Sequence, residues 1–101
     1  MADIKNVLGL KVGSVENDGT IRNLFGIKIG FVDDRGAILN IIGVMVGHVD
    51  SDGTIRNHAG VKYGTAHTDG TIKNRWGLRI GKIEPLEEIR LIGGSAIVLL
   101  L

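Results

Sequence analysis

Glycine recurs along this chain with a period of 17 residues. Of the 16 glycines, 15 fall at only three positions of that repeat. Isoleucine returns at the same interval in every copy, for example at Ile4, Ile21 and Ile38. The chain divides into six copies, which are 2–18, 19–35, 36–52, 53–69, 70–86 and 87–101. A fixed period predicts a repeat architecture in which each unit is buried against its neighbours, so we treat residues 1–101 as a single repeat domain.

The 17-residue unit contains two turn signals separated by short apolar-alternating runs. One is Asp-Gly, as at Asp52-Gly53, and the other is Asn-x-x-Gly, as at Asn57 to Gly60. Glycine and asparagine accept the positive φ of tight turns, and the Thr, Ile and Val between them favour strands. Before Gly81 no stretch runs ten residues without a glycine, so no helix is expected. The pattern predicts an all-β protein of about twelve short strands in hairpin-like units, the last one irregular.

Two architectures satisfy this pattern. One is a twisted single-layer sheet of consecutive antiparallel β-hairpins, and the other is a β-helix or solenoid with one coil per repeat. A hairpin with a bulge at Asn-x-x-Gly pairs Arg22 with Lys28 and Ile21 with Ile29. The following turn then pairs Phe31 with Ile38 and Val32 with Ala37. These registers place two sets of residues on opposite faces: Ile21, Asn23, Ile27, Ile29 and Ile38 on one, Thr20, Arg22, Lys28, Gly30 and Val32 on the other.

The third copy favours the hairpins. The two basic positions that pair in the hairpin register both become apolar there, as Leu39 and Met45. Joint change is typical of cross-strand neighbours. The β-helix stays open as the alternative, because its interior would accommodate a ladder of the repeated asparagines.

The strings Asp52-Gly-Thr-Ile-Arg-Asn57 and Asp69-Gly-Thr-Ile-Lys-Asn74 resemble a bacterial group of β-hairpin-repeat proteins of uncharacterised function. The resemblance covers about residues 2–83. It implies a free-standing single-layer sheet of hairpins that ends in an apolar strand. Some members look secreted and are associated with the use of complex carbohydrates. No signal peptide is evident here, which favours a cytoplasmic location and weakens the transfer of that role.

No catalytic, cofactor or metal constellation emerges from the residues. The chain has no cysteine. Asp50-Ser-Asp52-Gly53 begins like a calcium loop, but Ile55 and Val61 stand where glycine and a bidentate glutamate are needed. The three histidines, His48, His58 and His67, fall at different repeat positions. We therefore expect a non-enzymatic protein without a cofactor.

Charge follows the repeat. Nine of the 12 Lys and Arg occupy the two paired strand positions, which predicts a basic stripe on the outer face of the hairpins. Its candidate residues for an anionic partner are Arg22, Lys28, Arg56, Lys62, Lys73 and Arg79. An acidic polysaccharide suits such a stripe better than nucleic acid, because aromatic stacking partners are nearly absent. The simpler interpretation is a solvated face that blocks edge pairing.

The third copy is apolar on both expected faces, with Ala37, Leu39, Met45 and Val49 on the side that is charged in the other copies and Ile38, Val44 and Val46 on the apolar side. Its cover could be the C-terminal strand 97–101, a second copy of the chain or a partner protein, and of these we predict a second copy. The candidate oligomer contact comprises Leu39, Met45, Val49, Ile97 and Leu99. The function we expect is a structural or interaction module that self-associates as a homo-oligomer through its apolar sheet face. The alternative is a binding module for an anionic polymer on the basic stripe.

The C-terminal apolar run, 96–101, is too short to span a membrane.

Overall fold

The computed structural model describes residues 1–85 and 87–100. In this part of the chain ten short strands precede two short helices. The strands are β1 (Ala2–Asn6), β2 (Lys11–Val15), β3 (Thr20–Asn23), β4 (Lys28–Val32), β5 (Ala37–Asn40), β6 (Met45–Val49), β7 (Thr54–Asn57), β8 (Lys62–Ala66), β9 (Thr71–Asn74) and β10 (Arg79–Glu84). The helices are α1 (Ile89–Gly94) and α2 (Ala96–Leu99). Each of the first five copies thus forms one hairpin of two strands.

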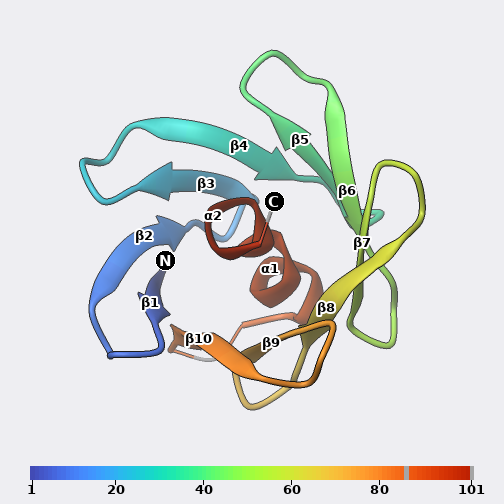
Figure 1. Cartoon of the computed structure of the whole chain (residues 1–101). Coiled ribbons are helices and arrows are strands. Elements are labelled where there is room, and N and C mark those ends of the chain that lie inside the picture. The colour runs from blue at the N-terminus through green and yellow to red at the C-terminus, as the bar shows by residue number, and fades with distance from the viewer. Residues whose placement is uncertain (86, 101) are drawn as a thin grey trace.

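The hairpins follow one another around a closed barrel (Figure 1). Each strand pairs antiparallel with its neighbours in sequence, which confirms the consecutive hairpins and does not support the solenoid. The expected open sheet is wrong, because β1 also pairs with β10 and places Ile4 opposite Ile83. Lys5 Nζ donates to Glu84 Oε2 at 2.9 Å near this seam. Strand twist curls the sheet onto itself, and closure removes the unpaired edges that an open sheet exposes.

The register within the hairpins differs from the expected one by a bulge. Arg22 does lie opposite Lys28, but the register then shifts, so Ile21 faces Gly30 rather than Ile29. Across the next turn Phe31 faces Leu39 and Val32 faces Ile38, one residue away from the expected pairs. The extra residue of a bulge reverses the inward and outward alternation beyond it. As a result Val32, beyond the bulge, is buried in the interior. Ile27 precedes β4 in the hairpin turn, outside the alternation of the strand, and is 59% exposed.

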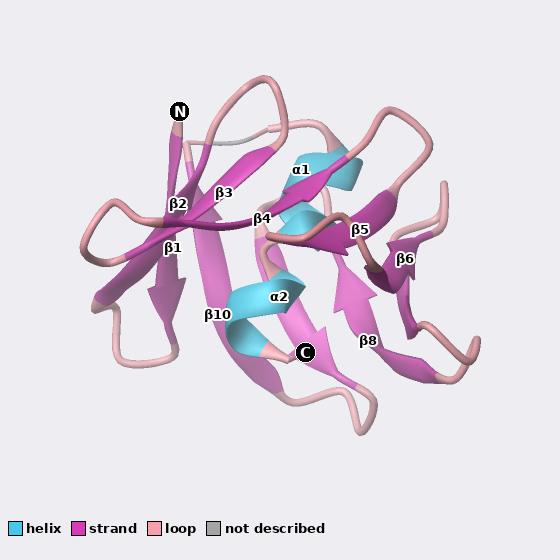
Figure 2. Cartoon of the chain, turned by 90° about the horizontal axis from the view of Figure 1, so that it is seen from above, coloured by secondary structure: helices cyan, strands magenta, loops and turns pink. Residues whose placement is uncertain are grey.

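Helices α1 and α2, from the sixth copy, fill the barrel (Figures 1 and 2). The expectation of a final apolar strand without helices is therefore wrong. A barrel of more than about eight strands encloses more space than its own inward side chains can fill. Leu91 and Ile92 of α1 occupy this space and are buried together with the repeated isoleucines of the five hairpins. The sixth copy supplies the centre of the core.

Glycines allow the helices to lie close to the wall. A Cβ atom added at Gly94 of α1 would come within 2.8 Å of Val32 Cγ1. In the wall itself, a Cβ atom at Gly30 would lie 2.5 Å from Ile97 Cδ1. At Gly30 the added Cβ would also lie 2.6 Å from the backbone carbonyl oxygen of Leu39, and at Gly94 it would lie 3.0 Å from Val32 Cβ, so neither contact is relieved by moving the end of a side chain alone. These glycines therefore make room for the helices.

Candidate functional site

Each hairpin ends in a tip that is organised by an asparagine side chain. In the second hairpin, Asn23 Oδ1 accepts hydrogen bonds from the backbone N–H groups of Phe25 at 2.9 Å and Ile27 at 3.1 Å. Gly26 adopts a φ of 80°, which glycine tolerates without strain. The other four tips repeat the side-chain contacts, through Asn6, Asn40, Asn57 and Asn74. Asparagine and glycine therefore supply the turn geometry by themselves.

The remaining tip positions are almost all apolar. Besides its asparagine and its glycine, each tip has three positions: two between these residues and one directly after the glycine. Of these 15 positions 13 are apolar, and only His58 and Arg75 are polar. We call the apolar set the apolar rim: Val7, Leu8, Leu10, Leu24, Phe25, Ile27, Ile41, Ile42, Val44, Ala59, Val61, Trp76 and Leu78. Exposed turns usually carry polar residues, so turn formation does not explain the rim.

The rim is strongly exposed to solvent. Phe25 is 84%, Ile42 79% and Trp76 72% exposed. The larger rim side chains together expose apolar surface on the order of 1,000 Å². The largest contiguous apolar patch on an ordinary monomer measures about 300–600 Å², and the rim exceeds this area only as the sum of its five tips. The rim therefore has the size of an interaction surface.

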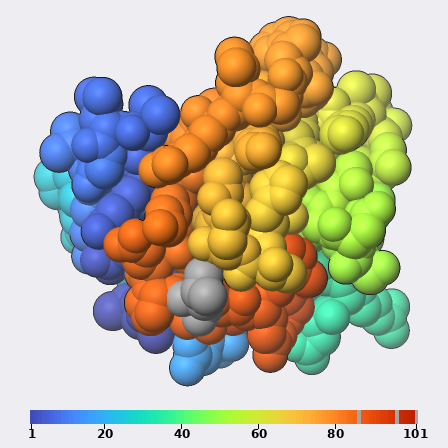
Figure 3. Space-filling model, turned by 90° about the horizontal axis from the view of Figure 1, so that it is seen from below, coloured from blue at the N-terminus to red at the C-terminus, as the bar shows by residue number. Residues whose placement is uncertain are grey.

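The tips surround the end of the barrel at which α2 finishes. Leu100 lines two hollows beside Tyr63: one of about 200 Å³ that reaches Trp76, and one of about 320 Å³ that reaches His58. A third hollow, of about 260 Å³, lies between the second and third hairpins at Ile41. In the space-filling view the tips of the first hairpin (blue) and the fifth (orange) stand apart as separate lobes (Figure 3). The rim is thus a ring of projections with gaps between them.

Basic residues lie on the outer wall directly behind the rim. Three of their pairs are cross-strand partners, as expected: Arg22 with Lys28, Arg56 with Lys62 and Lys73 with Arg79. Because the sheet closes, these residues lie around the outside of the barrel on four of its five hairpins, instead of lining one face of an open sheet; the third hairpin carries Leu39 and Met45 at the same positions. We call them, with the first hairpin's pair, the basic belt: Lys5, Lys11, Arg22, Lys28, Arg56, Lys62, Lys73 and Arg79.

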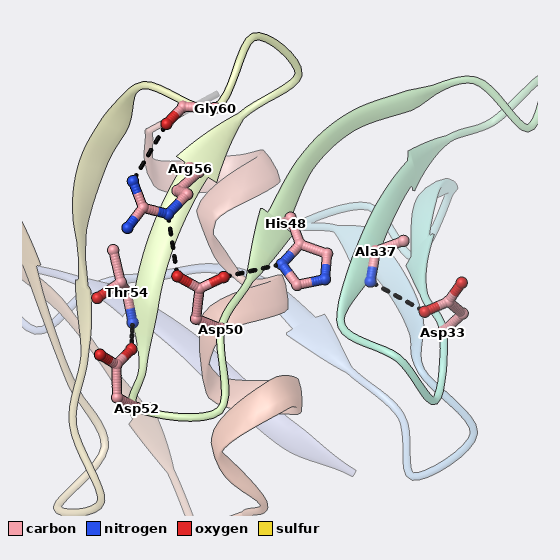
Figure 4. Close-up of polar contacts among 8 residues, drawn as sticks. All are labelled: Asp33, Ala37, His48, Asp50, Asp52, Thr54, Arg56 and Gly60. Atoms are coloured by element: carbon pink, nitrogen blue, oxygen red, sulfur yellow. Dashed lines mark hydrogen bonds and ion pairs between the residues drawn. The ribbon is translucent and has the colours of Figure 1, made fainter.

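Two belt arginines are engaged in contacts within the barrel. Arg56 Nε donates to Asp50 Oδ2 at 2.9 Å, and Arg56 Nη1 donates to the carbonyl oxygen of Gly60 at 3.1 Å (Figure 4). Arg22 makes the equivalent contacts in the second hairpin. Each arginine therefore ties a hairpin tip to a turn at the opposite end. This structural role accounts for both residues, which the sequence placed among the candidates for an anionic partner.

The other four candidates for an anionic partner carry exposed or half-exposed charge. Within residues 1–85 and 87–100, no carboxylate oxygen lies within 4.0 Å of the charged nitrogens of Lys28, Lys62, Lys73 or Arg79. The Lys28 ammonium lies 5.7 Å from the centroid of the Phe31 ring. These four cations leave positive charge beside the rim.

Acidic residues gather at the opposite end of the barrel. Ten of the 11 lie in or beside its turns: Glu16, Asp18, Asp33, Asp34, Asp50, Asp52, Asp69, Glu84, Glu87 and Glu88. The Thr54 N–H donates to Asp52 Oδ1 at 3.0 Å (Figure 4). This bond and a second one from the Thr54 hydroxyl lower the pKa of Asp52, because they stabilise its charged form. Equivalent threonine contacts lower the pKa of Asp18 and Asp69.

The predicted oligomer contact is divided between interior and surface. Val49 is buried in the core, and Ile97 and Leu99 pack against that core. The expected outward orientation of Val49 is wrong, because the bulge between Ile38 and Leu39 reverses the alternation in this hairpin. Leu39 and Met45 are cross-strand partners on the outer wall, and Met45 is 43% exposed. The structure therefore does not bring the five residues together on one surface.

The histidines are not brought together either. His48 Nδ1 lies 3.1 Å from Asp50 Oδ1, and His67 Nε2 lies 2.9 Å from Thr65 Oγ1. Across the described part of the chain, no three His, Asp or Glu side chains are grouped so that they could hold a metal ion. Neither α1 nor α2 has the length and apolar character that a membrane-crossing helix requires.

Sequence reasoning missed the rim. Its signal was present, since apolar residues fill 13 of 15 positions in turns whose geometry needs none of them. The expected pairing had assigned Ile27 and Val44 to the apolar sheet face and had left the other tip residues without a role. The structure shows that all of them project from the same end of the barrel.

Comparison with known proteins gives no match. The chain matches no family model, no curated protein and no solved structure.

Proposed function

We propose that the protein is a non-enzymatic interaction module whose working surface is the apolar rim. One observation carries the proposal: asparagine and glycine alone build the tips, yet 13 of the other 15 tip positions are apolar and exposed. Exposed apolar surface on this scale costs solubility, and in proteins it usually marks a docking surface. Summed over its five tips, the rim is also comparable in area with the roughly 800 Å² that one partner contributes to a standard interface.

The proposal moves the working surface away from the sheet face that the sequence favoured. That face is the barrel interior, and the chain's own α1 and α2 cover it. Among the described residues, nearly all of the exposed large apolar side chains belong to the rim, and the rim continues down the outer wall to Leu39 and Met45.

Site-specific photo-cross-linking in cells tests the proposal. A benzoylphenylalanine at position 25 replaces an aromatic side chain that projects from the rim. The same residue at position 17, an exposed turn position at the acidic end, is the matched control. We expect adducts at position 25, whether with a protein, a lipid or a second copy, and few at position 17. Equal yields at the two positions would contradict a working rim.

A second candidate function is the binding of an anionic polymer to the basic belt. The observation that favours it is the set of cations without an acidic partner in the described chain, among them Lys28 and Lys62. Salt-gradient elution from immobilised heparin or polygalacturonate tests it. The K28Q/K62Q variant should elute at lower salt, whereas R35Q, which removes an exposed cation at the acidic end, should not. Unchanged elution of K28Q/K62Q would exclude the polymer.

A further inference from the structure

We infer that the partner of the apolar rim is an anionic lipid surface, into which the five hairpin tips insert together. The inference rests on the proposed function, since it names the partner of the same rim. It requires an apolar ring that can enter the acyl boundary, cations at the height of the lipid phosphates, and an opposite end that stays in water. In the closed antiparallel barrel the tips lie at one end, the acidic turns at the other and the belt between them, with the tips splayed outward around the barrel (Figure 1).

The shape of the rim suits a fluid partner. The tips are separate projections, and hollows of about 200, 260 and 320 Å³ lie between and behind them. A protein interface reaches the packing density of an interior, so a folded partner would need a matching protrusion for each gap. Lipid chains are mobile and fill such gaps without a complementary shape. The exposed side chains are mainly aliphatic, with Trp76 among them, and tryptophan is favoured at membrane interfaces.

The belt lies at the depth that phosphate groups would occupy. Lys11, Lys28, Lys62 and Arg79 each follow directly after the last apolar position of a tip. One residue of a strand rises about 3.3 Å, so these cations begin only a few ångströms behind the rim. Amphipathic surfaces enter the headgroup and acyl boundary by about 5–10 Å. Their long side chains can also extend toward the phosphates while their stems cover apolar surface.

The charge distribution favours lipid over a second copy. Two barrels docked rim to rim would bring their basic belts toward each other, and the acidic ends would point away. Docking of a rim on an acidic end would bury carboxylates against apolar side chains, which is costly. An anionic bilayer instead complements both the rim and the belt. The acidic end is repelled by the same surface, so the molecule approaches with its tips first.

Vesicle flotation with the intact protein tests the inference. The probes are phosphatidylcholine vesicles with and without about 30% phosphatidylglycerol. Wild-type protein should float with the anionic vesicles and bind the neutral ones at least tenfold more weakly. The rim variant F25S/I42S/W76S should lose at least tenfold in binding to the anionic vesicles. All three side chains are exposed, so the variant should unfold at the wild-type temperature, and the single F25S variant provides a milder version of the same test.

The charge variants separate lipid from polymer binding. K28Q/K62Q should weaken binding to anionic vesicles about tenfold or more, since each lysine near a charged bilayer contributes about a fivefold effect. The matched control R35Q, at the acidic end, should stay within twofold. The rim variant should keep any retention on heparin, because that binding would use the belt alone.

The outcomes distinguish the lipid partner from the proposed function of the rim. Vesicle binding that the rim variant retains in full would overturn the inference. Absence of vesicle binding together with protein or self adducts at position 25 would overturn the lipid partner but leave the proposed function intact. Absence of both vesicle binding and rim adducts would contradict both.

Discussion

Gly93 of α1 lies so close to Val49 of β6 that a Cβ atom on the glycine would approach both γ-methyl carbons of the valine to 2.5 Å. The valine is buried in the barrel wall, and the glycine belongs to the helix that fills the interior. Gly93 is also the one glycine outside the 17-residue grid. The glycine at position 93 is therefore explained by the close packing of α1 against the barrel wall and not by the repeat.

The Gly93→Ala variant should be less stable than wild type by about 1–3 kcal/mol, because the added methyl group overpacks the core. Thermal and urea unfolding measure the change. Val49→Ala in the same chain removes the two clashing methyl carbons. The double variant should therefore lose less free energy of unfolding than the two single variants lose together.

Val15→Ala is the control for this pair. Val15 is buried in the same core, but it is not among the atoms nearest to the added Cβ at Gly93. The combination of Gly93→Ala with Val15→Ala should be additive within about 0.5 kcal/mol. If Val49→Ala and Val15→Ala relieved Gly93→Ala equally, the close approach of helix and wall would be disproved.

Asn57→Ala should destabilise the fourth hairpin by about 1–2 kcal/mol. The change leaves the N–H groups of Ala59 and Val61 without the side-chain acceptor that they share. Asn57→Asp keeps the acceptor oxygen and should recover most of the loss in urea unfolding. The neighbouring His58→Ala, at an exposed position, should change stability by no more than about 0.5 kcal/mol. An equal loss for Asn57→Ala and His58→Ala would count against the side-chain cap.

Acid should destabilise the barrel through its turn aspartates. Asp18, Asp52 and Asp69 have lowered pKa values because threonine N–H and hydroxyl groups bond to their carboxylates. A lowered pKa stabilises the fold above the unfolded value of about 3.9, and this contribution is lost as the pH falls through the folded pKa. Asp52→Asn keeps the acceptor but cannot titrate. The stability difference between wild type and Asp52→Asn should therefore shrink below about pH 4 in unfolding curves, and a constant difference would contradict the assignment.

The hairpins were predictable because their signals are local. Asn-x-x-Gly occurs in five of the six copies, Asp-Gly and Thr-Ile each occur three times, and cross-strand pairs such as Arg22 with Lys28 follow from turn geometry alone. The register beyond Lys28 was not predictable in the same way. It depends on a one-residue bulge, which the pattern accommodates equally well at neighbouring positions.

Closure and core filling depend on the whole chain. Whether β1 reaches β10 is set by the accumulated twist of ten strands, and no single copy records it. The run from Ile97 to Leu100 is as apolar as a strand, and only an interior too wide for side chains selects a helix there. The rim was not predicted because Ile27 and Val44 were assigned to the apolar sheet face and the other tip residues were given no role, although their positions in turns already set them apart.

Depth-dependent quenching of Trp76 tests the rim most directly, because this is the only tryptophan and it projects from a tip. Intact protein is mixed with phosphatidylglycerol-containing vesicles whose lipids carry a bromine or spin label at a known depth. We expect the Trp76 emission to shift to shorter wavelength and to be quenched most by labels just below the headgroups. Quenching of Trp76 by aqueous iodide alone, to the same extent with and without vesicles, would show that the tips stay in water and that the rim does not bind lipid.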